Sequence, residues 1–252
     1  MNLHLPFSQF ISEVIDDALS LDTRLVRTLR PLLFHPGLVT RDYLLGRRAT
    51  HAPPLRAYLI SALIFFGLFS IFPSRAQVEI FTTADTRSIE PGSRMTFEFP
   101  AHVPINDARY QQLVARAKAN PDDFARAAGA AVPRILFLFL PIFALLLELF
   151  YRRGYYLDHL VFSLYYHAFV FLVFSAMFLM SRTGGFLPGF VRTTVVIGFL
   201  IWLFAYLPIA LRRVYGGSKW KTFFKLVGLG VLYFVIFASG IPLVMFIGLS
   251  TF

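Results

Sequence analysis

Long apolar runs, separated by short polar segments, form the main pattern of this chain. A helix needs about 20 apolar residues to cross the roughly 30 Å hydrocarbon core of a bilayer. With their flanking residues, five runs reach that length, so we predict about five transmembrane helices. The last run contains Gly240 and Pro242, and we expect it either to kink as one span or to break at Pro242. The five runs are 55–72, 135–151, 155–180, 193–211 and 226–252.

The residues before the first run show a helical period in which apolar and basic side chains take opposite faces. Amphipathic helices of this kind typically lie in the headgroup region of a membrane. Packing against the ends of the spans is the alternative, and both arrangements can hold together. The apolar face of the best-defined segment carries Leu25, Val26, Leu29 and Leu33, and the basic face carries Arg24, Arg27 and Arg30.

The polar stretch 73–133 separates the first span from the others and contains seven acidic residues. Its alternating segments Val78 to Thr83 and Met95 to Phe99 predict two short strands, and the Ala-rich stretch 106–131 predicts helix. We therefore predict an all-α integral membrane protein with a small extramembrane α+β loop subdomain. Its predicted parts are 1–54 (amphipathic helices and a basic segment), 55–72 (first span), 73–133 (loop subdomain) and 134–252 (spans two to five).

Composition excludes a soluble fold. Hydrophobic residues make up 57% of the 252 residues, charged residues only 15%, and there are 30 Phe. A soluble protein of this length could not bury that much apolar surface and still keep a polar exterior. The chain has no Cys, which excludes disulfides, thiolate metal sites and a thiol nucleophile.

The net charge of +10 comes from basic residues that gather at the ends of the apolar runs. The segment through Arg56 and the short turns after spans two and four hold 14 of the 24 Lys and Arg residues. The positive-inside rule then predicts a cytoplasmic N-terminus and, with five spans, an extracytoplasmic C-terminus. This placement suits anionic membrane lipids as partners and disfavours nucleic acid.

Polar side chains at the predicted cytoplasmic ends of the spans form the candidate site, because such groups are costly near a bilayer and are often functional. We expect this site to bind a lipid headgroup or a protein partner, including a second copy of the chain. No cofactor is predicted. The candidate residues are Arg41, Arg47, Arg48, Arg152, Arg153, Asp158, His159 and Tyr215, with Glu148 and His167 as secondary candidates.

Four alternatives concern the same region of the chain. Glu148 precedes Arg152 by four residues, which predicts a helical ion pair at the membrane surface. His159 and His167 lie about 12 Å apart along a helix, too far to share one metal ion, so a helix–helix hydrogen bond is expected for His167. A Ser163–His159 contact would suit an intramembrane enzyme that acts on lipid, although no glycine-rich elbow accompanies it. A small transporter or channel would need a polar path deeper in the spans, where Ser175 stands nearly alone.

Several short motifs, taken in order, resemble a family of bacterial multi-span membrane proteins catalogued as domain of unknown function 3667. That resemblance implies a multi-pass protein of the bacterial inner membrane and brings no reaction with it. Many members of that family begin with a Cys-rich zinc ribbon, which this chain lacks. The motifs are Pro36-Gly37 through Gly46-Arg47-Arg48 to Pro54-Leu55, Leu140-Pro141 through Tyr151-Arg152-Arg153, Tyr155-Tyr156-Leu157-Asp158-His159-Leu160 through His167, and Arg213-Val214-Tyr215-Gly216.

Overall fold

The computed structural model describes residues 23–71, 112, 121–152, 154–182 and 188–251, and all the regular structure in these ranges is helical. The predicted strands 78–83 and 95–99, and with them most of the loop subdomain, lie outside the described residues. The helices are α2 (Thr23–Phe34), α3 (Leu38–Leu44), α4 (Pro54–Ile71), α6 (Pro121–Phe150), α7 (Tyr156–Arg182), α8 (Gly189–Tyr215) and α9 (Lys219–Thr251).

Four helical segments are long and apolar enough to cross a membrane, which supports a multi-pass membrane protein. The apolar part of α4, Pro54–Phe69, is shorter than these four, so the predicted first span, 55–72, is not among them. Helix α9 continues through Pro242 without a break, and α6 runs unbroken from Pro121 into the second predicted span. The four segments are Val132–Phe150, Tyr156–Arg182, Gly189–Tyr215 and Lys219–Gly240.

The described helices divide into two compact units. The first contains α2, α3, α4, α7 and α8, together with residues 140–150 of α6 and 219–232 of α9. The second contains the remaining parts of α6 and α9, where Ile135 and Phe139 are buried against Tyr233 and Ile236. Gly240 belongs to this second unit, and a Cβ atom there would lie 2.9 Å from the Phe139 ring.

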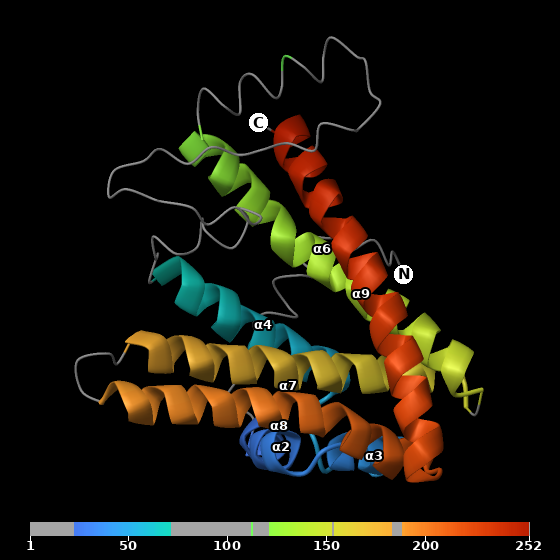
Figure 1. Ribbon diagram of the computed structural model, residues 1–252. Coiled ribbons are helices and arrows are strands. Elements are labelled where there is room, and N and C mark those ends of the chain that lie inside the picture. The colour runs from blue at the N-terminus through green and yellow to red at the C-terminus, as the bar shows by residue number, and fades with distance from the viewer. Residues whose placement is uncertain (1–22, 72–111, 113–120, 153, 183–187, 252) are drawn as a thin grey trace, which may run out of the picture. The chain divides into compact units, whose positions relative to one another are not determined.

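Helix α7 is the centre of the first unit, and its aromatic side chains set the position of α4 (Figure 1). Tyr58 contacts Phe171 with ring centroids 5.6 Å apart, and further along the pair Phe69 stacks on Phe178 at 4.5 Å. Residue numbers rise together along both helices, so α4 and α7 run parallel. The Tyr165 hydroxyl donates a 2.7 Å hydrogen bond to the Ala52 carbonyl, which places the start of α4 level with Tyr165.

Helices α2 and α3 pack against α8, which runs beside α7 (Figure 1). The last carbonyls of a helix have no partner within that helix, and α8 supplies donors for those of α2. The Tyr206 hydroxyl donates to the Leu32 carbonyl at 2.8 Å, and the Trp202 indole N–H donates to the Leu33 carbonyl at 2.9 Å. The two aromatic side chains of α8 therefore hold the carboxyl end of α2 in place.

The turn between α2 and α3 lies directly on the backbone of α8. Gly37 has φ +73°, and a Cβ atom there would lie 2.8 Å from the Ala210 carbonyl oxygen. A side chain at this position would therefore meet both a strained backbone conformation and a neighbouring main chain. The Arg213 guanidinium donates a 2.7 Å hydrogen bond to the Pro36 carbonyl, so two of the motifs that carry the family resemblance meet here.

Candidate functional site

The predicted site residues divide between two polar clusters of the first unit. One surrounds the loop between α3 and α4 and includes Arg47 and Arg48. The other surrounds the start of α7 and the end of α8 and includes Asp158, His159 and Tyr215. Arg41 is exposed on α3, and Arg153 lies outside the described residues.

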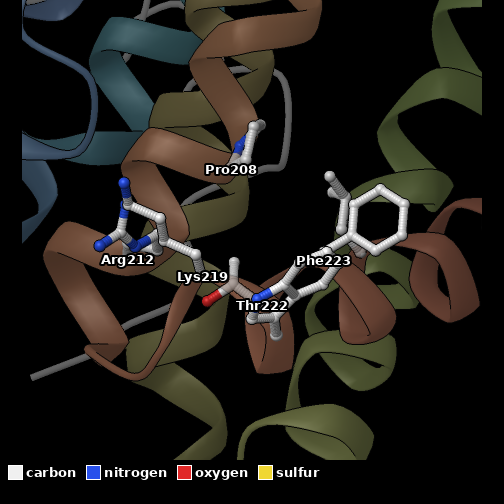
Figure 2. Close-up of a pocket in the computed structure, with 7 residues that line it drawn as sticks. Pro208, Arg212, Lys219, Thr222 and Phe223 are labelled. Carbon is white, nitrogen blue, oxygen red and sulfur yellow. The ribbon is translucent and has the colours of Figure 1, made fainter.

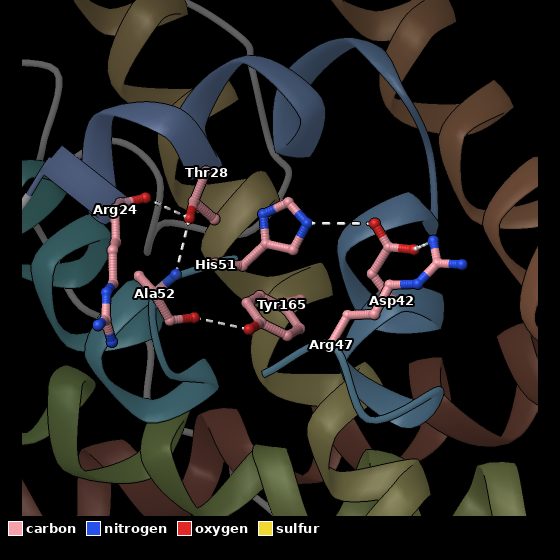
Figure 3. A network of polar contacts seen from close by, with 7 residues as sticks. All are labelled: Arg24, Thr28, Asp42, Arg47, His51, Ala52 and Tyr165. Atoms are coloured by element: carbon pink, nitrogen blue, oxygen red, sulfur yellow. Dashed lines mark hydrogen bonds and ion pairs between the residues drawn. The ribbon is translucent and has the colours of Figure 1, made fainter. Parts of the chain in front are cut away.

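The loop before α4 is fixed by a polar network that draws on three helices (Figure 3). The backbone N–H of Ala52 donates to the Thr28 hydroxyl of α2 at 2.8 Å, while its carbonyl accepts from Tyr165 of α7. The neighbouring His51 is buried and lies 3.3 Å, Nε2 to Oδ2, from Asp42 of α3. Sequence reasoning missed this network, because each residue in it is unremarkable alone.

The two arginines of this loop already have partners within the chain. The Arg47 guanidinium donates to Asp42 at 3.3 Å, and the Arg48 guanidinium lies 5.2 Å from the centroid of the Tyr43 ring. Asp42 thus offsets the charge of Arg47. These contacts leave Arg47 and Arg48 less suited to bind an anion than the sequence suggested.

The second cluster centres on His159, whose side chain is fully buried. Its Nδ1 atom and the Tyr215 hydroxyl lie 2.7 Å apart and form a hydrogen bond between α7 and α8. The Tyr215 ring in turn stacks on Tyr151 with centroids 4.6 Å apart. Residues 56 positions apart in sequence are therefore joined, so the structure brings together His159 and Tyr215 of the candidate site, while Arg47 and Arg48 lie in the other cluster.

Lys225 of α9 also belongs to this cluster. Its ammonium donates a 2.5 Å hydrogen bond to the Phe150 carbonyl at the end of α6 and lies 4.3 Å from the centroid of the Tyr151 ring. A cation at the carboxyl end of a helix is stabilised by the helix dipole, and a cation over an aromatic face is attracted by the ring electrons. Lys225 therefore ties the start of α9 to the end of α6.

Tyr151 should keep its proton at pH values well above those at which a phenol usually loses it. Burial raises the pKa of its hydroxyl to about 12, and this hydroxyl has no hydrogen-bond partner among the described residues. Its raised pKa contributes stability that is fully present below pH 10 and lost as the pH rises through about 12. We expect Tyr151→Phe to leave the 295 nm tyrosinate absorbance at pH 10 unchanged; a clear drop at that pH would contradict the assignment.

The remaining candidate residues near the start of α7 are Asp158, Glu148 and Arg152. The Asp158 carboxylate accepts from the Tyr155 backbone N–H at 2.9 Å, which organises the turn that starts α7. The predicted ion pair between Glu148 and Arg152 is wrong, since the two ion pairs found in the described residues both belong to Asp42. Helix α6 ends at Phe150, so exposed Arg152 is no longer one helical turn from Glu148.

The polar residues deeper in α7 bond mainly to nearby backbone. The Ser163 hydroxyl donates to the Leu140 carbonyl at 2.9 Å and lies 3.4 Å from His167 Nδ1, so the Ser163–His159 contact required by the enzyme alternative is absent. His167 Nδ1 bonds to the Ser163 carbonyl of its own helix at 2.8 Å. Its ring packs edge-on against Phe143 of α6. The Ser175 hydroxyl donates to the Phe171 carbonyl.

An open groove of about 430 Å³ lies where α8 ends and α9 begins (Figure 2). Arg212 and Lys219 are exposed there, and neither forms an ion pair with any carboxylate that the structure describes. The rest of the lining is mostly apolar, with the Trp220 side chain 74% exposed. The lining residues are Pro208, Arg212, Lys219, Trp220, Thr222, Phe223 and Leu226.

The described residues contain no group of three His, Asp or Glu side chains that could hold a metal ion. A family model described as Protein of unknown function (DUF3667) matches residues 22–66, which confirms the resemblance over α2, α3 and most of α4. No curated protein and no solved structure matches the chain.

Proposed function

We propose that this multi-pass protein, similar over residues 22–66 to a family of unknown function, binds the headgroup of an anionic phospholipid. The groove at the α8–α9 turn is the binding site, and it faces the cytoplasmic leaflet of the bacterial inner membrane. The observation that carries the proposal is the pairing of two exposed cations, Arg212 and Lys219, with an apolar lining at the ends of two membrane-length helices.

The side chains of the groove match the successive parts of a phospholipid. Arg212 and Lys219 donate to the phosphate, since a guanidinium and an ammonium both form charge-assisted hydrogen bonds with phosphate oxygens. Phe223 and Leu226 support an acyl chain, and Trp220 lies at the boundary where indole rings favour the headgroup region. The lining contains no carboxylate, so the groove offers no ionic partner to the ammonium of a zwitterionic lipid.

Fluorescence of Trp220 tests this function directly. The chain has two Trp, and Trp202 is bonded to α2 away from the groove. In nanodiscs, phosphatidylglycerol with a nitroxide near its headgroup should quench Trp220 more strongly than phosphatidylcholine with the same label. The double variant Arg212→Gln, Lys219→Gln should lower the preference for phosphatidylglycerol about fivefold per charge.

A matched control removes the same number of charges outside the groove. Arg152 and Lys221 are exposed and do not line it, so Arg152→Gln with Lys221→Gln should keep most of the preference. Equal losses in both double variants would show a general surface charge effect and would overturn the site. Trp220→Phe should abolish the lipid-specific quenching, which assigns the signal.

A further inference from the structure

The outward face of α2 carries two kinds of side chain that rarely share a water-exposed surface. The side chains of Val26 and Phe34 are 62% and 65% exposed. Arg27 and Arg30 are exposed beside them. Positions 26, 30 and 34 follow one another at four-residue steps, so they form one line along the helix, with Arg27 next to it. On the opposite side, Thr28 and Leu32 are buried.

The contacts of α4 give the depth at which this face lies. Helix α4 has 18 residues, about 27 Å at a 1.5 Å rise per residue, which is close to the thickness of the hydrocarbon core. A span that short must begin near one membrane boundary. Ala52, in the loop just before it, is held at the level of Tyr165 of α7, whose hydroxyl donates to the Ala52 carbonyl.

Helix α2 lies at that same level. Its last turn bonds to Tyr206 of α8, and the Tyr206 ring stacks on Phe169 of α7 with centroids 3.5 Å apart. The Thr28 hydroxyl of α2 also accepts from the Ala52 backbone N–H, so α2 and the start of α4 share one depth. Figure 1 shows α2 nearly along its axis while α7 and α8 lie across the view, so α2 runs crosswise to the spans.

We infer that the face formed by Val26, Arg27, Arg30 and Phe34 is a membrane contact, which lies on the anionic headgroups of the bilayer beside the bundle. The two apolar side chains enter the boundary between headgroups and acyl chains, and the two guanidinium groups bind phosphates. Helix α2 contains no acidic residue, so charge complementarity selects an anionic surface. This surface is separate from the α8–α9 groove and does not depend on it.

Nitroxide labels can measure the depth of this face, and the absence of Cys makes single-site labelling clean. Labels at Val26→Cys and Phe34→Cys are compared with one at Leu63→Cys, an exposed position in the middle of α4. In nanodiscs with phosphatidylglycerol, both α2 labels should collide more often with oxygen than with a water-soluble nickel complex. The Leu63→Cys label should show this preference most strongly.

Charge is tested by adding Arg27→Gln and Arg30→Gln to the Phe34→Cys chain. We expect the ratio of membrane-contacting to water-exposed label to fall about fivefold per charge, and to fall similarly when phosphatidylcholine replaces phosphatidylglycerol. Labels fully open to the nickel complex in both lipids would overturn the inference, as would protection that appears only after an acidic protein is added. The Arg212→Gln, Lys219→Gln variant should leave these labels unchanged, which separates this test from that of the groove.

Discussion

Gly37→Ala should destabilise the folded protein by about 3 kcal/mol. A non-glycine residue at φ +73° costs about 1 kcal/mol or more, and the new Cβ atom would lie 2.8 Å from the Ala210 carbonyl oxygen and 2.9 Å from its Cα. Both neighbours are main-chain atoms of a long helix, so neither can move without shifting α8. Urea or SDS unfolding of the purified protein, followed by circular dichroism, measures the change.

Gly46→Ala is the matched control for this change. Gly46 has φ +83°, yet a Cβ atom there has no heavy atom within 4 Å. The same substitution therefore imposes the conformational cost without the clash, and should destabilise by about 1 kcal/mol. Equal losses of stability in the two variants would contradict the close contact between Gly37 and the α8 backbone. A selective loss at Gly37 would also release α2, which the Phe34→Cys label would report as faster motion.

Tyr215→Phe should cost about 1–3 kcal/mol, because it leaves His159 Nδ1 buried without its hydrogen-bond partner. His159 is fully buried, so water cannot replace the lost hydroxyl without entering the bundle. A cycle with Tyr215→Phe, His159→Phe and the double variant isolates the interaction between the two side chains. We expect the double variant to be less destabilised than the sum of the single variants by about 1 kcal/mol or more.

Tyr156→Phe is a suitable comparison for the Tyr215 change. The Tyr156 hydroxyl donates to the Pro141 carbonyl at 3.4 Å, at the long limit of a hydrogen bond, so its removal should cost less. Equal losses in the two Tyr→Phe variants, or strictly additive behaviour of Tyr215→Phe and His159→Phe, would contradict a specific bond between α7 and α8.

The helices themselves could be predicted from local pattern. Runs of Phe, Leu, Ile and Val long enough to cross a bilayer have few other stable environments, because each backbone group must bond within its own segment there. The start of α9 differs from the prediction, because the helix includes Lys219 and Lys221, whereas the predicted apolar run begins at residue 226. Ser218 precedes this start, and its hydroxyl accepts from the Lys221 backbone N–H at 3.4 Å, as a helix N-cap does.

The composition of the sites could not be predicted in the same way. Periodicity placed His159 and Tyr215 near the same end of their helices, because both lie close to the ends of apolar runs. It could not assign partners, since a hydrogen bond of 2.7 Å depends on how two helices are rotated about their axes. The alternative contact between Ser163 and His159 does not form, because the Ser163 hydroxyl donates to the Leu140 carbonyl of α6.

The sequence by itself determined a helical membrane protein with many of its cations near the ends of its apolar runs, because hydrophobic length and charge placement act locally along the chain. Only the tertiary structure decided which cations have partners. Asp42 binds Arg47 and Pro36 accepts from Arg213, whereas Arg212 and Lys219 line an open groove. That distinction depends on distances between segments far apart in sequence, which helix packing sets and local pattern does not.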